Sequence, residues 1–297
     1  MDSALSTVAL PLALAVVMFG LGLSLTPADF ARVGRQPKAV VIALALQLLL
    51  LPVLCFGLVL AFDLPPLLAV GMLLLAASPG GTTANLFSHL FRGDVALNIS
   101  LTAINSVIAV VTLPLVTNLA VGWFDPPEAG TLGLQFGKTV QVFAIVLIPV
   151  ALGMLVRRSA PAFADRMDKP VRILSAVVLA LVIVGTMLAE RDDVGNYLRD
   201  VGLPALVFCL CSLAVGFAVP RLLGIGRTQA IASSFEIGIH NSTLAIAVAV
   251  SVLGSVELAV PAAVYGVLMF PVAALFGWVI TRTGAAARDE GEPVRAG

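Results

Sequence analysis

The chain is a succession of long apolar stretches separated by short polar connections. Most stretches approach the roughly 20 apolar residues that a helix needs to cross the bilayer core, which is about 30 Å thick. A helix also pairs its own backbone N–H and C=O groups, as a lipid environment requires. The predicted spans cover residues 8–25, 39–62, 67–91, 95–121, 140–156, 171–188, 203–219, 230–253 and 259–280. The pattern therefore predicts an all-α integral membrane protein with nine transmembrane helices in a single transmembrane domain, residues 1–297.

Two of these segments are interrupted near their middle. Segment 67–91 contains Pro79, Gly80 and Gly81, and segment 230–253 contains a polar run from Glu236 to Thr243. Proline removes a backbone donor, and glycine makes a break easier. Because the two segments stand five spans apart, they cross the membrane in opposite directions, which is typical of inverted-topology repeats with broken helices at the midplane. The alternative is a simple kink in each, since Pro and Gly are common in membrane helices.

The basic residues divide unevenly among the predicted connections. All but Lys138, Arg191 and Arg199 fall on one side of the membrane, so the positive-inside rule places the N-terminus outside and the C-terminus in the cytoplasm. The composition is 60% hydrophobic and 11% charged with zero net charge, which excludes a soluble domain and a basic nucleic-acid surface. We expect membrane lipid as a partner and no nucleic acid.

A few polar side chains lie deep within the spans, and Glu236 is the most informative. A charged group at the bilayer centre is costly, and the span cores contain no Lys or Arg to pair with it. Its expected partner is a metal ion or a proton. Asn98, Thr102 and Asn105 share one helical face and offer the oxygen ligands that a hard cation prefers.

Two further polar residues leave alternatives open. Gln47 stands alone in an apolar run, where glutamine commonly joins helices by hydrogen bonds, and His240 could be a proton site or a packing residue.

Motifs of the common catalytic sites are absent from the sequence. It has no phosphate-binding loop, HExxH pair or GxSxG turn, so we expect a protein that is not an enzyme.

Three long motifs resemble the bile acid:sodium symporter family, and the chain looks like a bacterial nine-span member. The motifs are VMFGLGLSLTPADF, ASPGGTTANLFSHLFRGDVALNISLT and FEIGIHNS. The resemblance implies two inverted repeats with two broken crossing helices. It also implies a core domain of spans two, three, four, seven, eight and nine, and a panel domain of spans one, five and six.

The resemblance implies two sodium sites and an adjacent substrate site. The first sodium site would use Asn85, Asn98, Thr102 and Glu236, with Ala84 replacing the usual serine. The residues implied for the second site are Gln47, Glu236, the carbonyls of Ile237 and Ile239, and His240 in place of glutamine. Thr82, Thr83 and Asn241 would contact the substrate.

Together these observations predict a sodium-coupled symporter of the inner cell membrane that works by alternating access. Its substrate would be an organic anion, either a bile acid or a small 2-oxo or pantoate-like acid. One alternative is a proton-coupled carrier or an exporter on the same fold. Another is a membrane protein that does not transport, such as a sensor or an intramembrane enzyme.

Overall fold

The structure is a computed structural model. It describes residues 15–16, 19–20, 22–23, 26, 32–126, 136–167, 170, 173–174, 177 and 194–289. Within these residues the chain forms helices, and its β pairing is limited to one isolated bridge between Gly80 and His240. Four described helices are long and apolar enough to cross a membrane: Pro37–Ala61, Val95–Phe124, Arg199–Leu222 and Glu257–Arg282. The expectation of an apolar all-α protein is confirmed for this part of the chain.

Helices α4 (Pro37–Ala45) and α5 (Leu51–Ala61) are joined by a π-helical turn, η3 (Leu46–Leu50), and occupy the second predicted span. Pro52 follows this turn closely. Proline has no backbone N–H to donate to the preceding turn, and its ring would clash with a carbonyl of that turn in a regular α-helix. A wider π turn relieves that conflict. Gln47 lies in the widened turn and is buried.

Both predicted interruptions are present. The third predicted span is divided into α6 (Pro66–Ala76) and α7 (Thr83–Leu90), and the eighth is divided into α13 (Arg227–Gly238) and α14 (Ser242–Ser251). The first interruption contains the Pro-Gly-Gly sequence, and the second begins directly after Gly238. Helices α6 and α14 are too short to cross a bilayer alone, so each interrupted pair would span it together.

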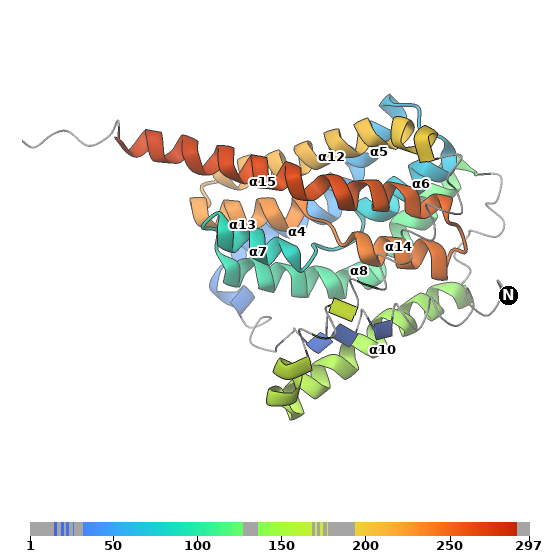
Figure 1. Cartoon of the computed structure of the whole chain (residues 1–297), viewed down its shortest axis with the longest axis horizontal. Helices are drawn as coiled ribbons and strands as arrows, with labels where there is room; N and C mark the ends of the chain where they lie inside the picture. Colours follow the sequence, from blue (N-terminus) through green and yellow to red (C-terminus); the bar gives the residue numbers. More distant parts are fainter. Residues whose placement is uncertain are drawn as a thin grey trace, which may run out of the picture.

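Long helices enclose these four short ones (Figure 1). They are α8 (Val95–Phe124), α12 (Val194–Leu222) and α15 (Val260–Asp289). The Asp94 carboxylate caps α8 by accepting the Leu97 N–H at 3.0 Å. Gly216 of α12 lies so close to Ser234 of α13 that a side chain there would meet the backbone of Ser234. The short connecting helices are η2 (Arg32–Arg35) and η4 (Glu257–Ala259).

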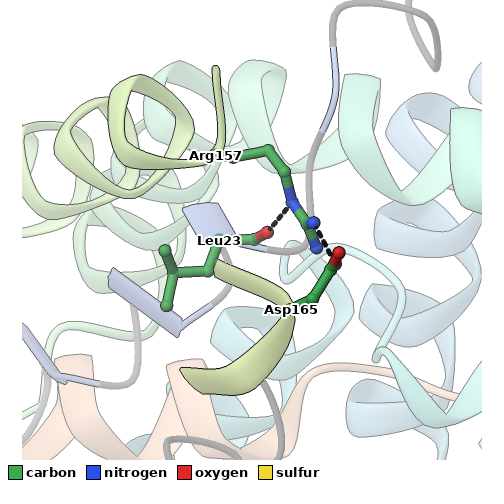
Figure 2. A network of polar contacts seen from close by, with 3 residues as sticks. All are labelled: Leu23, Arg157 and Asp165. Carbon is green, nitrogen blue, oxygen red and sulfur yellow. Dashed lines mark hydrogen bonds and ion pairs between the residues drawn. The ribbon is translucent and has the colours of Figure 1, made fainter. Parts of the chain in front are cut away.

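Helix α10 (Phe136–Ser159) lies at the edge of the bundle on the side of α8, and it packs against the described residues near the N-terminus (Figure 1). Gly22 and Gly153 bring the backbone near the N-terminus into direct contact with the backbone of α10. A Cβ on Gly22 would clash with Val150, and a Cβ on Gly153 would clash with Phe19 and Gly22. Figure 2 shows Arg157 reaching from α10 to the Leu23 carbonyl, at 2.5 Å from Nε, and to the Asp165 carboxylate.

The described helices coincide with seven of the predicted segments, those within residues 39–156 and 203–280. Segment 171–188 lies almost entirely outside the described residues, and segment 8–25 is described only at a few positions. The count of nine spans, the inverted repeats and the division into core and panel stay predictions.

Candidate functional site

The two interrupted helices cross at their unwound segments and pair with each other. The Gly81 N–H donates to the Ile239 carbonyl at 2.6 Å, and the Asn241 N–H donates to the Pro79 carbonyl at 2.8 Å. These two hydrogen bonds flank the bridge between Gly80 and His240. Backbone groups that leave a helix inside an apolar protein need partners, and here each interruption supplies them to the other.

Glu236 lies on α13 beside this crossing and is completely buried. Thr102 Oγ1 lies 2.5 Å from one carboxylate oxygen, and Asn105 Nδ2 donates to the other at 3.0 Å. The backbone N–H of Gly80 also hydrogen-bonds the carboxylate. A Cβ at position 80 would collide with the carboxylate, so only glycine permits this approach. No Lys or Arg within the described residues forms an ion pair with Glu236.

Several buried amide oxygens have no donor among the described residues. Asn98 Nδ2 donates to the Ala232 carbonyl at 2.8 Å, and Asn98 Oδ1 has no donor in the described part of the chain. The side-chain oxygens of Asn85 and Asn105 are likewise buried without a partner in the described part of the chain. Thr102 can give its one proton either to Glu236 or to the Asn98 carbonyl at 3.1 Å. Amide, hydroxyl and carboxylate oxygens of this kind are the ligands that a hard cation prefers.

Gln47 and His240 meet at a single acceptor, the Ser78 carbonyl. Gln47 Nε2 donates to it at 2.9 Å, and His240 Nδ1 lies 3.3 Å from it. In the neutral tautomer that makes this second bond, Nδ1 carries the proton and Nε2 is an acceptor. Both Gln47 Oε1 and His240 Nε2 are buried and lack a partner among the described residues. The imidazole contacts both Phe208 and Tyr265, with ring centroids 5.5 and 5.4 Å away, and these two rings also contact each other at 5.9 Å.

The carbonyls at the end of α13 are released from regular helical pairing. In a continuous helix the Asn241 N–H would donate to the Ile237 carbonyl, but it donates to Pro79 instead. The Ile239 carbonyl accepts from Gly81 and keeps a second lone pair. Both isoleucines are buried, and because their side chains are hydrocarbon, they can offer only backbone oxygen to a cation.

The predicted substrate residues lie at the N-termini of the two second half-helices. Thr82 precedes α7, is exposed, and makes no capping hydrogen bond. Thr83 begins α7 and is partly buried. Asn241 caps α14, because its Oδ1 accepts the Leu244 N–H at 3.0 Å. The crossing therefore brings two helix N-termini, each with a partial positive charge, into one region.

The structure brings some predicted residues together directly and others indirectly. Thr102 contacts Glu236, Asn98 connects to Thr102 through its own carbonyl, and Gln47 meets His240 at Ser78. No described hydrogen bond joins Asn85 to this group. Asn105 donates to Glu236, as the face that it shares with Asn98 and Thr102 indicates, although the resemblance includes it in neither sodium site. The contacts of Ser78, Gly80 and Tyr265 at the crossing are not predicted by the sequence.

Two interrupted helices that meet at their unwound segments are typical of secondary transporters in membranes. Residues 11–196 match the family model described as Sodium Bile acid symporter family. The chain therefore belongs to the sodium bile acid symporter family, as the three sequence motifs predicted. The matched range includes α7 and the face of α8 that carries Asn98, Thr102 and Asn105.

Three relatives illustrate the range of this similarity. The chain is 29% identical to the probable sodium/metabolite cotransporter BASS2, chloroplastic, of Oryza sativa subsp. japonica, over 86% of this chain and 60% of that protein. It is 28% identical to the uncharacterized sodium-dependent transporter YocS of Bacillus subtilis (strain 168), over 86% of this chain and 77% of that protein. It is 27% identical to the ileal sodium/bile acid cotransporter of Homo sapiens, over 81% of this chain and 68% of that protein.

Proposed function

We propose that this protein is a sodium-coupled symporter that carries an organic anion across the membrane by alternating access. The observation that carries the proposal is Glu236, a fully buried carboxylate with no described basic partner and with unpaired amide oxygens nearby. The names of the relatives, which refer to sodium and to metabolite or bile acid cotransport, support the same function.

On this proposal the first sodium site consists of Asn85, Asn98, Thr102 and Glu236. A bound sodium ion would supply the positive charge that neutralises the carboxylate. The unpaired amide oxygens fit this role, because amide, hydroxyl and carboxylate oxygens are the ligands of hard cations. Asn105 orients the carboxylate from the opposite oxygen, and the Thr102 hydroxyl can turn its proton toward the Asn98 carbonyl to expose a lone pair.

The second sodium site would use Gln47, Glu236, the carbonyls of Ile237 and Ile239, and His240. The unpaired Gln47 Oε1 fits a hard cation well. The unpaired His240 Nε2 fits less well, since an imidazole nitrogen is a softer ligand than oxygen. The same nitrogen could accept a proton, and this favours a proton-coupled carrier as the second candidate function.

The organic anion would bind next to Thr82, Thr83 and Asn241. Both α7 and α14 begin there, and the N-terminal N–H groups of a helix attract negative charge. The names of relatives refer to metabolite and to bile acid cotransport, which supports an organic anion as the substrate. The candidates that the family resemblance implies are a bile acid or a small 2-oxo or pantoate-like acid. Symport of two sodium ions with one monoanion would move one net charge, worth about 2.3 kcal/mol per 100 mV.

The proposal includes the topology predicted from the sequence. It has nine spans in two inverted repeats, with the N-terminus outside the cell membrane and the C-terminus in the cytoplasm. The core would hold spans two, three, four, seven, eight and nine, and the panel spans one, five and six. The close contact of α10 with residues near Gly22 supports grouping spans one and five in the panel.

Uptake into proteoliposomes tests the function. The purified protein is supplied with labelled pantoate, pyruvate or taurocholate, with an inward sodium gradient or with choline replacing sodium. We expect uptake of at least one anion that requires sodium and responds to membrane potential. Uptake driven equally well by a proton gradient without sodium would overturn sodium coupling in favour of the second candidate.

A further inference from the structure

The hydroxyl of Tyr265 reaches from α15 to the last residue of α13. It donates to the Gly238 carbonyl at 2.8 Å, and the tyrosine is completely buried. Gly238 stands between Ile237 and Ile239, whose carbonyls belong to the proposed second cation site. A buried tyrosine hydroxyl needs an acceptor, and this one uses a carbonyl that the helix itself cannot pair.

This hydrogen bond fixes one peptide plane at the end of α13. The plane between Gly238 and Ile239 is held on its N–H side by the Phe235 carbonyl at 2.9 Å, and on its C=O side by Tyr265. The helical donor for the Gly238 carbonyl would be the Ser242 N–H, but that group donates to the His240 carbonyl at 2.9 Å. Tyr265 therefore replaces a helical hydrogen bond that the interruption removes.

The same tyrosine also contacts the interruption beyond Gly238. Its ring meets the His240 ring edge to face at 5.4 Å, and Phe208 stacks on that imidazole at 5.5 Å. Tyr265 thus touches both the carbonyl that precedes the unwound segment and the side chain within it. Cys209 is a weaker neighbour of the same carbonyl, with its sulfur 4.0 Å away.

We propose that Tyr265 is a positioning residue for the second cation site. By drawing the Gly238 carbonyl toward α15, its hydroxyl sets the orientation of the neighbouring Ile237 and Ile239 carbonyls. Ligands that are oriented before binding need no further ordering when the cation arrives. This inference rests on the proposed sodium-coupled function, because it concerns the ligands of that site.

The test is Tyr265→Phe, which removes the hydroxyl and keeps the ring contacts. The measurement is the half-saturating sodium concentration, taken from thermal unfolding in detergent with sodium chloride replacing choline chloride, and from uptake where a substrate is known. We expect this concentration to rise about fivefold, as the loss of about 1 kcal/mol from one buried hydrogen bond implies. The maximal uptake rate should change less than about twofold, because no group that contacts the anion is altered.

Ser234→Ala is a matched control. It removes another buried hydrogen bond between helices, from Ser234 Oγ to the Leu213 carbonyl at 2.7 Å, and that carbonyl is no proposed ligand. The control should lower the unfolding temperature and leave the half-saturating sodium concentration unchanged. If Tyr265→Phe behaves like the control, the positioning role is overturned.

Two further outcomes are informative. If the wild-type protein shows no sodium dependence at all, the proposed function is overturned, independently of Tyr265. If Tyr265→Phe fails to fold, Cys209→Ala tests the same carbonyl through its weaker donor, and we expect a rise of about twofold in half-saturating sodium. No rise in this variant would then overturn the role assigned to the Gly238 carbonyl.

Discussion

Replacement of Glu236 by glutamine separates the charge of this residue from its hydrogen bonds. Glutamine has nearly the same size, and its Oε1 can still accept from Asn105 Nδ2, which now donates to the carboxylate at 3.0 Å. The new NH2 group would face Thr102 Oγ1, whose proton can turn to the Asn98 carbonyl at 3.1 Å. Because these hydrogen bonds are kept, we expect the free energy of unfolding to change by no more than about 1 kcal/mol.

The loss of charge should be far larger in its effect on sodium binding. Two unit charges about 4 Å apart interact by about 4 kcal/mol at an effective dielectric constant of about 20. At about 1.4 kcal/mol for each factor of ten, this corresponds to a sodium affinity roughly a thousandfold lower. Both proposed sodium sites share Glu236, so the variant should lose sodium-driven uptake completely.

The assay combines sodium titration of thermal unfolding in detergent with uptake in proteoliposomes. Glu257→Gln is the matched control, because it makes the same chemical change at the start of η4, at a partly exposed position. We expect normal sodium dependence in the control. If Glu236→Gln takes up substrate with a half-saturating sodium concentration within tenfold of the wild-type value, the reasoning from charge is wrong.

Three other substitutions test separate parts of the crossing and its surroundings. Gly80→Ala places a Cβ against the Glu236 carboxylate, so thermal unfolding should show a free energy of unfolding that is lower by about 1–3 kcal/mol. A variant as stable as the wild-type protein would contradict the close approach of Gly80 to Glu236. His240→Gln puts an amide oxygen where His240 Nε2 has no partner among the described residues, so the half-saturating sodium concentration in uptake should fall. An unchanged concentration would leave His240 as a packing residue. Arg157→Ala removes the hydrogen bond to the Leu23 carbonyl and the ion pair with Asp165, so the unfolding temperature should fall while sodium affinity stays unchanged. A changed sodium affinity would mean that the Arg157 contacts influence the cation sites at the crossing.

The interruptions could be predicted from the sequence because local chemistry produces them. Pro79 and the two glycines after it prevent a regular helix, and the polar residues from Glu236 onward are costly in an unbroken apolar span. The pairing of the interruptions with each other could not be predicted in this way. Gly81 and Ile239 are distant in the chain, and a single tertiary hydrogen bond produces no periodic pattern.

The site could be predicted only in part for a similar reason. The spacing of Asn98, Thr102 and Asn105 places them on one helical face, but it does not show which of them contacts Glu236. Tyr265 gives no signal in an apolar segment, where an aromatic residue ordinarily belongs to the core. Its role depends on which acceptor its hydroxyl reaches, and the packing of α15 against α13 determines that acceptor.

The crossing connects the stability of the fold with the occupancy of the site. A buried acceptor without a donor costs roughly 1–3 kcal/mol, and among the described residues Asn98 and Asn105 each present one on the helix whose Thr102 contacts the buried carboxylate. Such costs are a large fraction of the roughly 5–15 kcal/mol by which a typical soluble domain is stable. On the proposed function, a cation would offset them only in the arrangement that gathers these oxygens together. Alternating access needs this kind of element, because a ligand shifts a conformational equilibrium only by its difference in affinity between the two arrangements.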